Sequence, residues 1–447
     1  MNGLTGARVL LLDDEPGEAL PIIKAFSKVG VPVAYFDGKP GQTPRNRDRL
    51  HGIRLAILDM DLGFGGPPEN MASTMLQTLA RIIHPENGPY GVLIWTNHPD
   101  QKETFTRFMY ERSTLPNPVF VVMLKKADFI VGSSSNSGKR RFSIGKLSTE
   151  LVKILAETSP LEFMQVWEGS AFRAASNVTN ALAELSQLTA DSLEQWKKQW
   201  HDETLKLLLV ISRAQAEAHH TRDNCIPSMF LALNPLHSDR MDALVTESSR
   251  ELFKHIDQIM NATGSSSIER RAKVNSMLHL ASNDLDTFSP GNLYVVEGRR
   301  PSIFPALKDM LRNSMNGDEA AQAKNLELVI QKGRQCGIEI TPLCDYAQDK
   351  MGLSRVIVGF VLPQEHKKLV KRTDFLKPIG PFYLDGGGSP SGAYNIYLDS
   401  RYVVAAEPRL VKKLRAKARV RPQLLADVQF WASYQAARQG VILLSDK

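Results

Sequence analysis

Two short apolar runs near the start of the chain each end in acidic residues. Asp13 and Asp14 follow the first run, and Asp59 and Asp61 follow the second. If both runs are strands of one open parallel sheet, their carboxyl ends line a common crevice, and the carboxylates meet there. Carboxylates crowded in this way repel one another, and a small hard cation such as Mg²⁺ offsets that cost by taking some of their oxygens together with water. We therefore expect a Mg²⁺ site at these strand ends.

Two later residues could assist phosphoryl chemistry in the same crevice. Thr96 ends a further apolar run, and its hydroxyl can donate to a phosphoryl oxygen. Lys126 follows the next run and offers a point charge for the same oxygens, although Lys125 could take that role instead. A carboxylate that attacks a phosphoryl group in line needs positioning and charge balance rather than a general base. The residue set suits that reaction.

The elements that must hold these residues alternate in type over the first third of the chain. Apolar runs typical of strands occupy residues 9–12, 31–36, 55–58, 92–95 and 119–124. Helical patterns occupy residues 17–29, 70–84, 100–112 and 143–157. This alternation predicts an α/β domain with a doubly wound parallel sheet over residues 1–158, covered by helices on both faces.

The strand-end residues, in this strand order, resemble those of the response-regulator receiver domain. The residues that carry the resemblance are Asp13, Asp14, Asp59, Thr96 and Lys126. The spacing between the first acidic pair and Asp59 also fits that family. The sequence departs from the family where Ala127 replaces the proline after the lysine and where Asn97, rather than a small residue, follows the strand-four hydroxyl. The resemblance implies a flavodoxin-like sheet.

The same resemblance implies a role for each residue. Asp59 would accept the phosphoryl group, and Thr96 would be the switch hydroxyl. Asp13 and Asp14 would hold Mg²⁺ together with the backbone carbonyl of Asp61. Lys126 would match the lysine that this family carries at the end of strand five.

Residues 159–286 carry a helical pattern. Ser159, Pro160 and Glu162 form the signature of a capped helix start. Apolar residues then recur at three- and four-residue spacing and predict one buried stripe, formed by Met164, Trp167, Ala171, Ala175, Val178, Leu182 and Leu185. We expect a helical middle domain.

Residues 287–447 change to strand-like segments separated by turn residues. The expected strands lie at 292–296, 337–342, 355–362, 381–385, 394–398 and 401–404, before a helix at 422–440. This pattern predicts a small antiparallel barrel or curled sheet. The segment that ends in Cys344 and Asp345 resembles strand ends of small SH3-like barrels related to toxin ribonucleases. The adjacent carboxylate disfavours a thiolate, so we expect no nucleophile at Cys344.

Composition narrows the class of protein. The three cysteines include no Cys-x-x-Cys pair, the start lacks a signal-peptide pattern, and no apolar run is long enough to cross a bilayer. These features favour the cytoplasm. The net charge is +7, and a basic stretch at 409–421 could bind phosphates, although a solvated helix face is the favoured interpretation.

The three-part layout resembles the response-receiver proteins of bacterial conflict and phage-defence systems. That resemblance implies a setting rather than a mechanism. Our first hypothesis is a signalling protein that receives phosphate from a histidine-kinase-like partner and whose receiver then changes how the helical domain and the barrel pack or bind a downstream protein. Its only chemistry would be its own phosphorylation. One alternative is a nucleic-acid-binding or RNA-cleaving effector, but His366 is the only histidine in residues 287–447 and has no evident acid–base partner. The other alternative is a scaffold with an inactive receiver.

Overall fold

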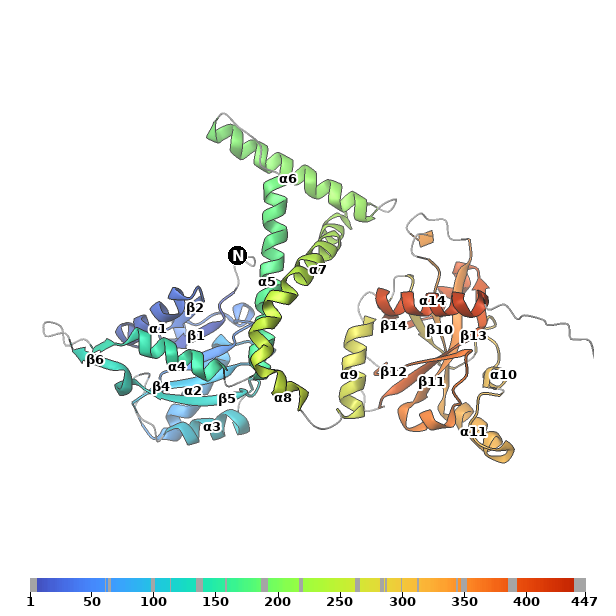
Figure 1. Ribbon diagram of the computed structural model, residues 1–447, viewed down its shortest axis with the longest axis horizontal. Coiled ribbons are helices and arrows are strands. Elements are labelled where there is room, and N and C mark those ends of the chain that lie inside the picture. Colours follow the sequence, from blue (N-terminus) through green and yellow to red (C-terminus); the bar gives the residue numbers. More distant parts are fainter. Residues whose placement is uncertain are drawn as a thin grey trace, which may run out of the picture. The chain divides into compact units, whose positions relative to one another are not determined.

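The computed structural model describes most of the chain and divides it into two compact units (Figure 1). The first unit contains Met1–Leu185 and Pro235–Asn261, and the second contains Ser186–Asn234 and Ala262–Lys447. The described residues are 6–60, 62, 66–97, 101–112, 114–133, 140–156, 159–185, 192–216, 220–261, 266–281, 285, 288–298, 300–311, 313–342, 345–346, 352–384 and 392–437. The expected three-domain boundaries stay a prediction, since the helical stretch contributes to both units.

A five-stranded, all-parallel sheet forms the centre of the first unit. Its strands are β1 (Val9–Leu12), β2 (Val33–Phe36), β3 (Leu55–Leu58), β4 (Gly91–Thr96) and β5 (Phe120–Lys125), in the order β2-β1-β3-β4-β5. This is the order of a doubly wound sheet, in which the strand order reverses between β1 and β3 while all the strands stay parallel. The register pairs Leu12 with Leu58, so the residues that follow them, Asp13 and Asp59, leave the sheet side by side.

Helices cover both faces of this sheet. They are α1 (Pro16–Lys28), α2 (Pro68–Ile82), α3 (Gln101–Arg112) and α4 (Ile144–Ala156). Leu10 and Leu12 pack toward α2 and α3, whereas Val9 and Leu11 pack toward α1 and α4, as the alternating directions of strand side chains require. The predicted parallel sheet with its helices is therefore confirmed, with element ends displaced by one or two residues.

A short hairpin between the sheet and α4 was not predicted. Strands β6 (Ile130–Ser133) and β7 (Arg140–Phe142) pair antiparallel where the sequence suggested only a surface connection. The hairpin is missed because three or four residues rich in glycine, serine and arginine give no alternating apolar pattern. Its flanking rings pack on Trp95, with ring centroids 5.4 Å away for Phe129 and 5.9 Å away for Phe142.

Helix α5 (Ser159–Leu185) is tied to the amino-terminal ends of two strands by an ion cluster. Arg54 directly precedes β3 and donates from Nε to Glu168 Oε2 at 2.9 Å, while its Nη2 bonds the other oxygen of Glu168. Arg8 directly precedes β1 and donates to Glu168 Oε2 at 3.0 Å. The helix is thus held at the edge of the sheet opposite to Asp13 and Asp59.

The expected apolar stripe of α5 is wrong in part. Val178 is buried as predicted, but Trp167 is 58% exposed, and Met164 and Leu185 are exposed too. The buried residues instead include Leu161 and Ser170, whose hydroxyl lies 2.6 Å from that of Ser248. Sequence periodicity alone could not show that polar contacts and the Glu168 cluster rotate the helix this way.

The start of α5 also differs from expectation. Glu162 was predicted to bond back to the first turn, but its carboxylate accepts hydrogen bonds from Lys254 and His255, each at 2.6 Å. Partial burial acts to raise the pKa of Glu162, yet these hydrogen bonds outweigh it and lower the pKa. The side chains of Ser159 and Pro160 lie outside the described residues. The remaining helices of this stretch are α6 (Leu193–Ala216), α7 (Cys225–Leu252), α8 (Ile256–Met260) and α9 (Ile268–His279).

The second unit contains a seven-stranded antiparallel sheet with the order β12-β13-β11-β10-β9-β14-β8. Its strands are β8 (Leu280–Ala281), β9 (Asn292–Val295), β10 (Arg334–Glu339), β11 (Ser354–Pro363), β12 (Leu376–Phe382), β13 (Tyr394–Ala406) and β14 (Ala416–Val420). A curled sheet in this part of the chain agrees with the sequence, while its SH3-like character stays a prediction. The two strands expected at 394–398 and 401–404 are one continuous strand, β13.

Two strands of this sheet were misplaced for identifiable reasons. A strand was expected at 381–385, whereas β12 covers Leu376–Phe382. It contains Pro378 and Pro381 and lies at the end of the sheet order, where proline is tolerated. β14 lies in the second half of the basic stretch at 409–421, where no strand was expected and only the first half was predicted to be helical. Ala416 and Ala418 are buried while the lysine and arginine between and after them are half-exposed, which is the two-residue period of a strand.

Helices α10 (Leu307–Leu311), α11 (Glu319–Lys332), α13 (Pro408–Val411) and α14 (Pro422–Ala437) complete the second unit. A helix was expected at 422–440, and α14 buries Leu425, Val428 and Ala432 against the sheet core. Within the described residues, no helix is long and apolar enough to cross a membrane.

Replacing Glu168 by glutamine should loosen the docking of α5. The change removes the charge that both arginines share and leaves Arg54, which is only 9% exposed, without its counter-ion. Loss of a hydrogen-bonded, partly buried charge pair costs about 1–3 kcal/mol. We expect E168Q to lower the free energy of unfolding of the first unit by that amount in urea titrations. Glu184, an exposed residue of the same helix, provides the control E184Q, and an equal effect of both changes would contradict the docking role.

Candidate functional site

Three strand-end carboxylates meet at the carboxyl edge of the parallel sheet. Asp13, Asp14 and Asp59 each offer an oxygen, and these oxygens all lie within 4.8 Å of one another. Asp13 and Asp59 are buried, whereas Asp14 is half-buried. The predicted meeting of these acids is confirmed, and the cluster could bind a metal ion. Asp61, whose carbonyl was expected to take part, lies outside the described residues.

The backbone fixes the two buried carboxylates before any side-chain contact is made. The amide of Asp13 donates to the carbonyl of Phe36 at 3.2 Å, and the amide of Asp59 donates to that of Leu12 at 2.8 Å. Each acid therefore continues the sheet pairing by one residue. The Asp13 carboxylate then accepts the amide of Glu15 at 2.9 Å, which orients it at the start of α1.

A buried lysine links the carboxylates. Lys126 Nζ lies 2.6 Å from Asp59 Oδ2, 2.5 Å from Glu18 Oε2 and 3.4 Å from Asp13 Oδ2. Its side chain is only 4% exposed. Lys125, the alternative candidate, is exposed. The structure therefore brings Lys126, and not Lys125, to the acidic cluster.

Glu18 is the member of this cluster that the sequence did not reveal. It lies in the first turn of α1, which begins at Pro16 almost immediately after β1 and so carries Glu18 back over the crevice. Acidic residues are common in first turns because they interact favourably with the helix dipole. That general preference hides the specific contact with Lys126, so no sequence signal distinguishes it.

Burial and like charges perturb the titration of the site. Burial is the main cause that raises the pKa of Asp13 to about 7, and the charges of Asp59 and Glu18 add to it, against the opposing effect of Lys126. Burial acts to lower the pKa of Lys126, but the charges of Asp13 and Asp59 outweigh it and raise the pKa. One ammonium thus faces several carboxylates, and a divalent cation would offset the surplus negative charge.

Thr96 completes the edge. It ends β4, which lies between β3 and β5 in the sheet order, and it is 1% exposed. Its neighbour Asn97 accepts the amide of Ala127 at 3.2 Å and so links the ends of β4 and β5. The structure therefore assembles Asp13, Asp14, Asp59, Thr96 and Lys126 at one edge. The roles of these residues stay predictions.

The other sequence candidates do not form a second cluster of this kind in the described part of the chain. Cys344 lies outside the described residues. Within the basic stretch, Lys417 pairs with Glu297 at 2.8 Å and Arg419 donates to Asn292 at 2.9 Å. These two residues of β14 thus contact neighbouring residues, whereas Lys412, Lys413 and Arg415 of the same stretch are exposed.

Comparison with known proteins assigns no family. No family profile matches the chain, and no curated protein matches it. A solved structure that contains the trimeric coiled coil of yeast Spc42, fused to another structure, is 17% identical, covers 40% of this chain and 97% of its own, and aligns with a TM-score of 0.18. That likeness is too weak to indicate a shared fold, so the function must be argued from the site.

Mg²⁺ should bind more tightly as the pH rises through 7. Metal binding requires the ionised carboxylate, and Asp13, with a pKa of about 7, is largely protonated at pH 6 and largely ionised at pH 8. We expect an affinity gain of about tenfold over this range by calorimetric titration, the change in the ionised fraction of one such group. The variant D13N should bind more weakly and with little pH dependence. An affinity of the wild type that does not change with pH would contradict Asp13 as a ligand.

Proposed function

We propose that this chain is a phosphorylation-controlled signalling protein, in which Asp59 accepts a phosphoryl group from a histidine-kinase-like donor. One observation carries the proposal: buried Lys126 contacts Asp59 at 2.6 Å, within a cluster where Asp13 and Asp14 offer carboxylate oxygens to the same small volume. This combination of a nucleophilic carboxylate, a cation and further metal-binding acids supports a receiver-type switch. The proposed cofactor is Mg²⁺, held by Asp13, Asp14 and Asp59.

The reaction balances with the residues of the site. An oxygen of Asp59 attacks the phosphorus in line, the bond from phosphorus to the donor breaks, and the leaving group takes the electron pair, which yields an acyl phosphate. When bound, Mg²⁺ would neutralise charge on the phosphoryl oxygens. Lys126 would bind one of those oxygens, and the Thr96 hydroxyl would donate to another. No proton needs to leave Asp59, since it reacts as a carboxylate.

Phosphorylation changes the charge that Lys126 must balance. The acyl phosphate carries more negative charge than the original carboxylate and places it further from the strand end. Lys126 is also bonded to Glu18 at 2.5 Å, so its ammonium must divide its contacts between the phosphoryl group and α1. The two states therefore differ in the contacts of one buried cation, as any switch requires.

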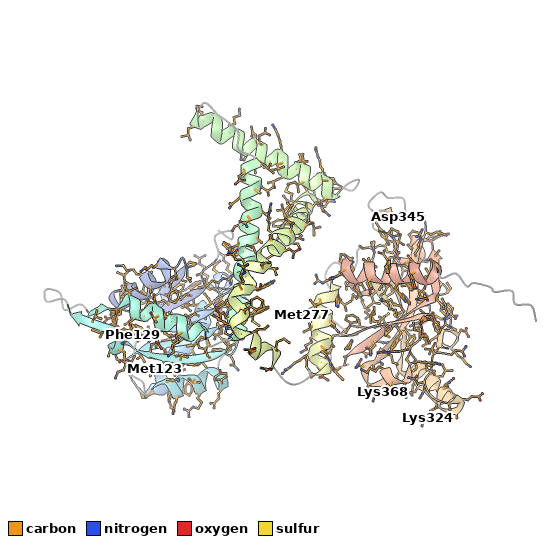
Figure 2. The ribbon with its side chains drawn as sticks, in the orientation of Figure 1. Met123, Phe129, Met277, Lys324, Asp345 and Lys368 are labelled. Carbon is orange, nitrogen blue, oxygen red and sulfur yellow. The ribbon has the colours of Figure 1, made fainter. Side chains whose placement is uncertain are left out.

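A contact path leads from Lys126 to the helices. Lys126 begins a short 3-10 helix that ends at Phe129, and this ring packs on Trp95, the residue before Thr96 (Phe129 is labelled in Figure 2). Lys146 of α4 donates to the carbonyl of Asp128 at 2.8 Å. A shift of Lys126 would thus act on α4, which contacts α5. We propose that the signal passes through α4 and changes how α5 packs against the rest of the chain or binds a downstream partner.

A cytoplasmic role in bacterial phage defence is part of the proposal, and it rests on the sequence resemblance. The alternatives are an effector that binds or cleaves nucleic acid and a scaffold with an inactive receiver. His366, the one histidine of the C-terminal region, has a carboxylate of Glu365 at 3.4 Å, but no described contact arranges the pair for acid–base catalysis. RNA cleavage by the full chain would favour the effector.

Asp59→Asn should abolish phosphorylation. The amide cannot form an acyl phosphate, whereas it keeps the size of the side chain. With acetyl phosphate and Mg²⁺, we expect the wild type to gain the mass of one phosphoryl group by mass spectrometry and D59N to gain none. The matched control is D48N, since Asp48 is exposed and lies outside the cluster. Equal labelling of D59N and the wild type would remove Asp59 from the role, and no labelling of either would favour the inactive scaffold.

Phosphorylation should change hydrogen exchange in α4 and α5, and Lys146 should be needed for that change. K146Q removes the contact with Asp128, whereas the control K153Q changes an exposed lysine of the same helix that pairs with Glu150. We expect wild type and K153Q to show altered protection in α5 after phosphorylation and K146Q to show a much smaller change. A change confined to the acidic cluster in the wild type would contradict the coupling.

A further inference from the structure

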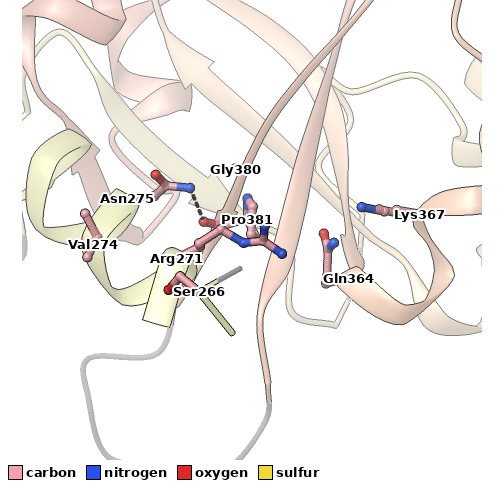
Figure 3. A pocket seen from close by; sticks show the side chains of 8 residues that line it. All are labelled: Ser266, Arg271, Val274, Asn275, Gln364, Lys367, Gly380 and Pro381. Atoms are coloured by element: carbon pink, nitrogen blue, oxygen red, sulfur yellow. Dashed lines mark hydrogen bonds between the residues drawn. The ribbon is translucent and has the colours of Figure 1, made fainter. Parts of the chain in front are cut away.

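We propose that a cavity in the second unit binds a small phosphate-bearing molecule. The cavity has a volume of about 540 Å³, within the range of roughly 300–1,000 Å³ typical of small-molecule sites. It lies between α9, β12 and the 3-10 helix Gln364–Leu369 (Figure 3). Its lining residues are Ser266, Arg271, Val274, Asn275, Gln364, Lys367, Gly380 and Pro381. This site is separate in sequence and chemistry from the acidic cluster.

Among the described lining residues there are two cations and no acid. Arg271 and Lys367 extend from opposite sides toward Gln364 (Figure 3), and neither forms an ion pair or a side-chain hydrogen bond within the described residues. Like charges that converge on one cavity repel, and an anion between them would remove that repulsion. A guanidinium and an ammonium together suit a phosphate group, which offers several oxygens to both.

Gln364 adds a third donor side chain to the lining of the cavity. Its side chain is nearly buried, at 8% exposure, and its carbonyl oxygen accepts a hydrogen bond from Asn395 at 2.5 Å. The amide nitrogen of Gln364 has no partner in the described part of the chain. This nitrogen is therefore a donor that a ligand oxygen in the cavity could accept from. The cavity is then lined by three donor side chains, those of Arg271, Lys367 and Gln364.

The walls of the cavity are fixed rather than loose. Asn275 of α9 donates to the carbonyl of Pro381 at 3.0 Å, and the next residue, Ser276, bonds to both the amide and the carbonyl of Tyr383. Gly380 has φ of 112°, a conformation that side chains rarely adopt, so this wall carries no Cβ. A prearranged site loses little free energy in ordering its walls when a ligand binds.

The apolar part of the lining limits the rest of the ligand. Val274 and the ring of Pro381 can pack against a short carbon skeleton, and the described lining residues include no aromatic ring that could stack on a nucleobase. We therefore expect a phosphate ester with a small organic group, or inorganic phosphate itself. The two sources share the donor set of Arg271, Lys367 and Gln364, and affinity for each distinguishes them.

The test uses the full chain with the D59N change and no Mg²⁺, so that phosphate cannot react or bind at the first site. Inorganic phosphate, glycerol phosphate, a nucleoside monophosphate and succinate are titrated by calorimetry. We expect saturable binding of the phosphate compounds and much weaker binding of succinate. If glycerol phosphate binds more tightly than inorganic phosphate, the organic group of the ester contacts the apolar wall and the ligand is a phosphate ester. If inorganic phosphate binds more tightly, the ligand is free phosphate.

Matched variants separate the site from general surface charge. R271Q and K367Q should each weaken phosphate binding about tenfold or more, the loss expected when one hydrogen bond to a charged group is removed. The controls R270Q and K368Q change exposed neighbours that do not line the cavity, and they should change the affinity by less than about twofold (Lys368 is labelled in Figure 2). Unchanged thermal unfolding of the variants without ligand would show that they fold.

Three results would overturn the proposal. They are the absence of saturable phosphate binding, an equal loss of affinity in the control variants, and binding of succinate as tight as that of phosphate. The first would leave Arg271 and Lys367 as solvated surface cations. The second would indicate diffuse attraction by the basic surface, and the third would indicate a carboxylate site.

Discussion

The acidic edge of the parallel sheet depends on the contacts that the buried ammonium of Lys126 makes with its carboxylates. A parallel sheet places the ends of β1, β3, β4 and β5 together, and the sequence gives the first two of these strand ends acidic side chains. Without a cation, the carboxylates of Asp13, Asp59 and Glu18 would repel one another, since little water reaches them to screen their charges. Lys126 bonds to all three, and Asp13 still has a raised pKa, so the lysine offsets the repulsion only in part. The remaining imbalance is what makes the edge receptive to a divalent cation and, in our proposal, to a phosphoryl group.

The sequence predicted the parallel sheet well because its strands are short, wholly apolar runs between amphipathic helices. It failed where local pattern and tertiary position disagree. β12 contains two prolines that only its place at the end of the sheet permits, and β14 alternates alanine with basic residues, which a charge-based interpretation takes for a helix face. Trp167 belongs to the periodic stripe of α5 yet remains exposed, since the contacts of Glu168 and Ser170 decide the rotation of that helix.

The candidate site also contains residues that the sequence could predict and residues that it could not. Asp13, Asp14, Asp59, Thr96 and Lys126 could be predicted because each follows directly from a strand end, and the sheet order then fixes which ends are neighbours. The choice between Lys125 and Lys126 could not be made from adjacent residues of one type, and burial decides it. Glu18 could not be found because it reaches the cluster from a helix. The cavity around Gln364 was also out of reach, since its donors come from segments almost a hundred residues apart and meet only through the antiparallel sheet.

The two ends of the parallel sheet carry opposite electrostatic arrangements, and under the proposed function this would limit how a signal could travel. The carboxyl ends hold the acidic cluster, whereas the amino ends hold Arg8 and Arg54, which bind Glu168 of α5. β1 and β3 between them are fully buried and in regular register, so they are poor candidates for movement. Interiors packed in this way change between discrete arrangements rather than deform continuously. Motion is more easily accommodated at the segment after β5, where Lys126 is followed by Phe129 and then by α4. The anchor at Glu168 would then act as a pivot for α5, while the contact of α4 with α5 supplies the displacement.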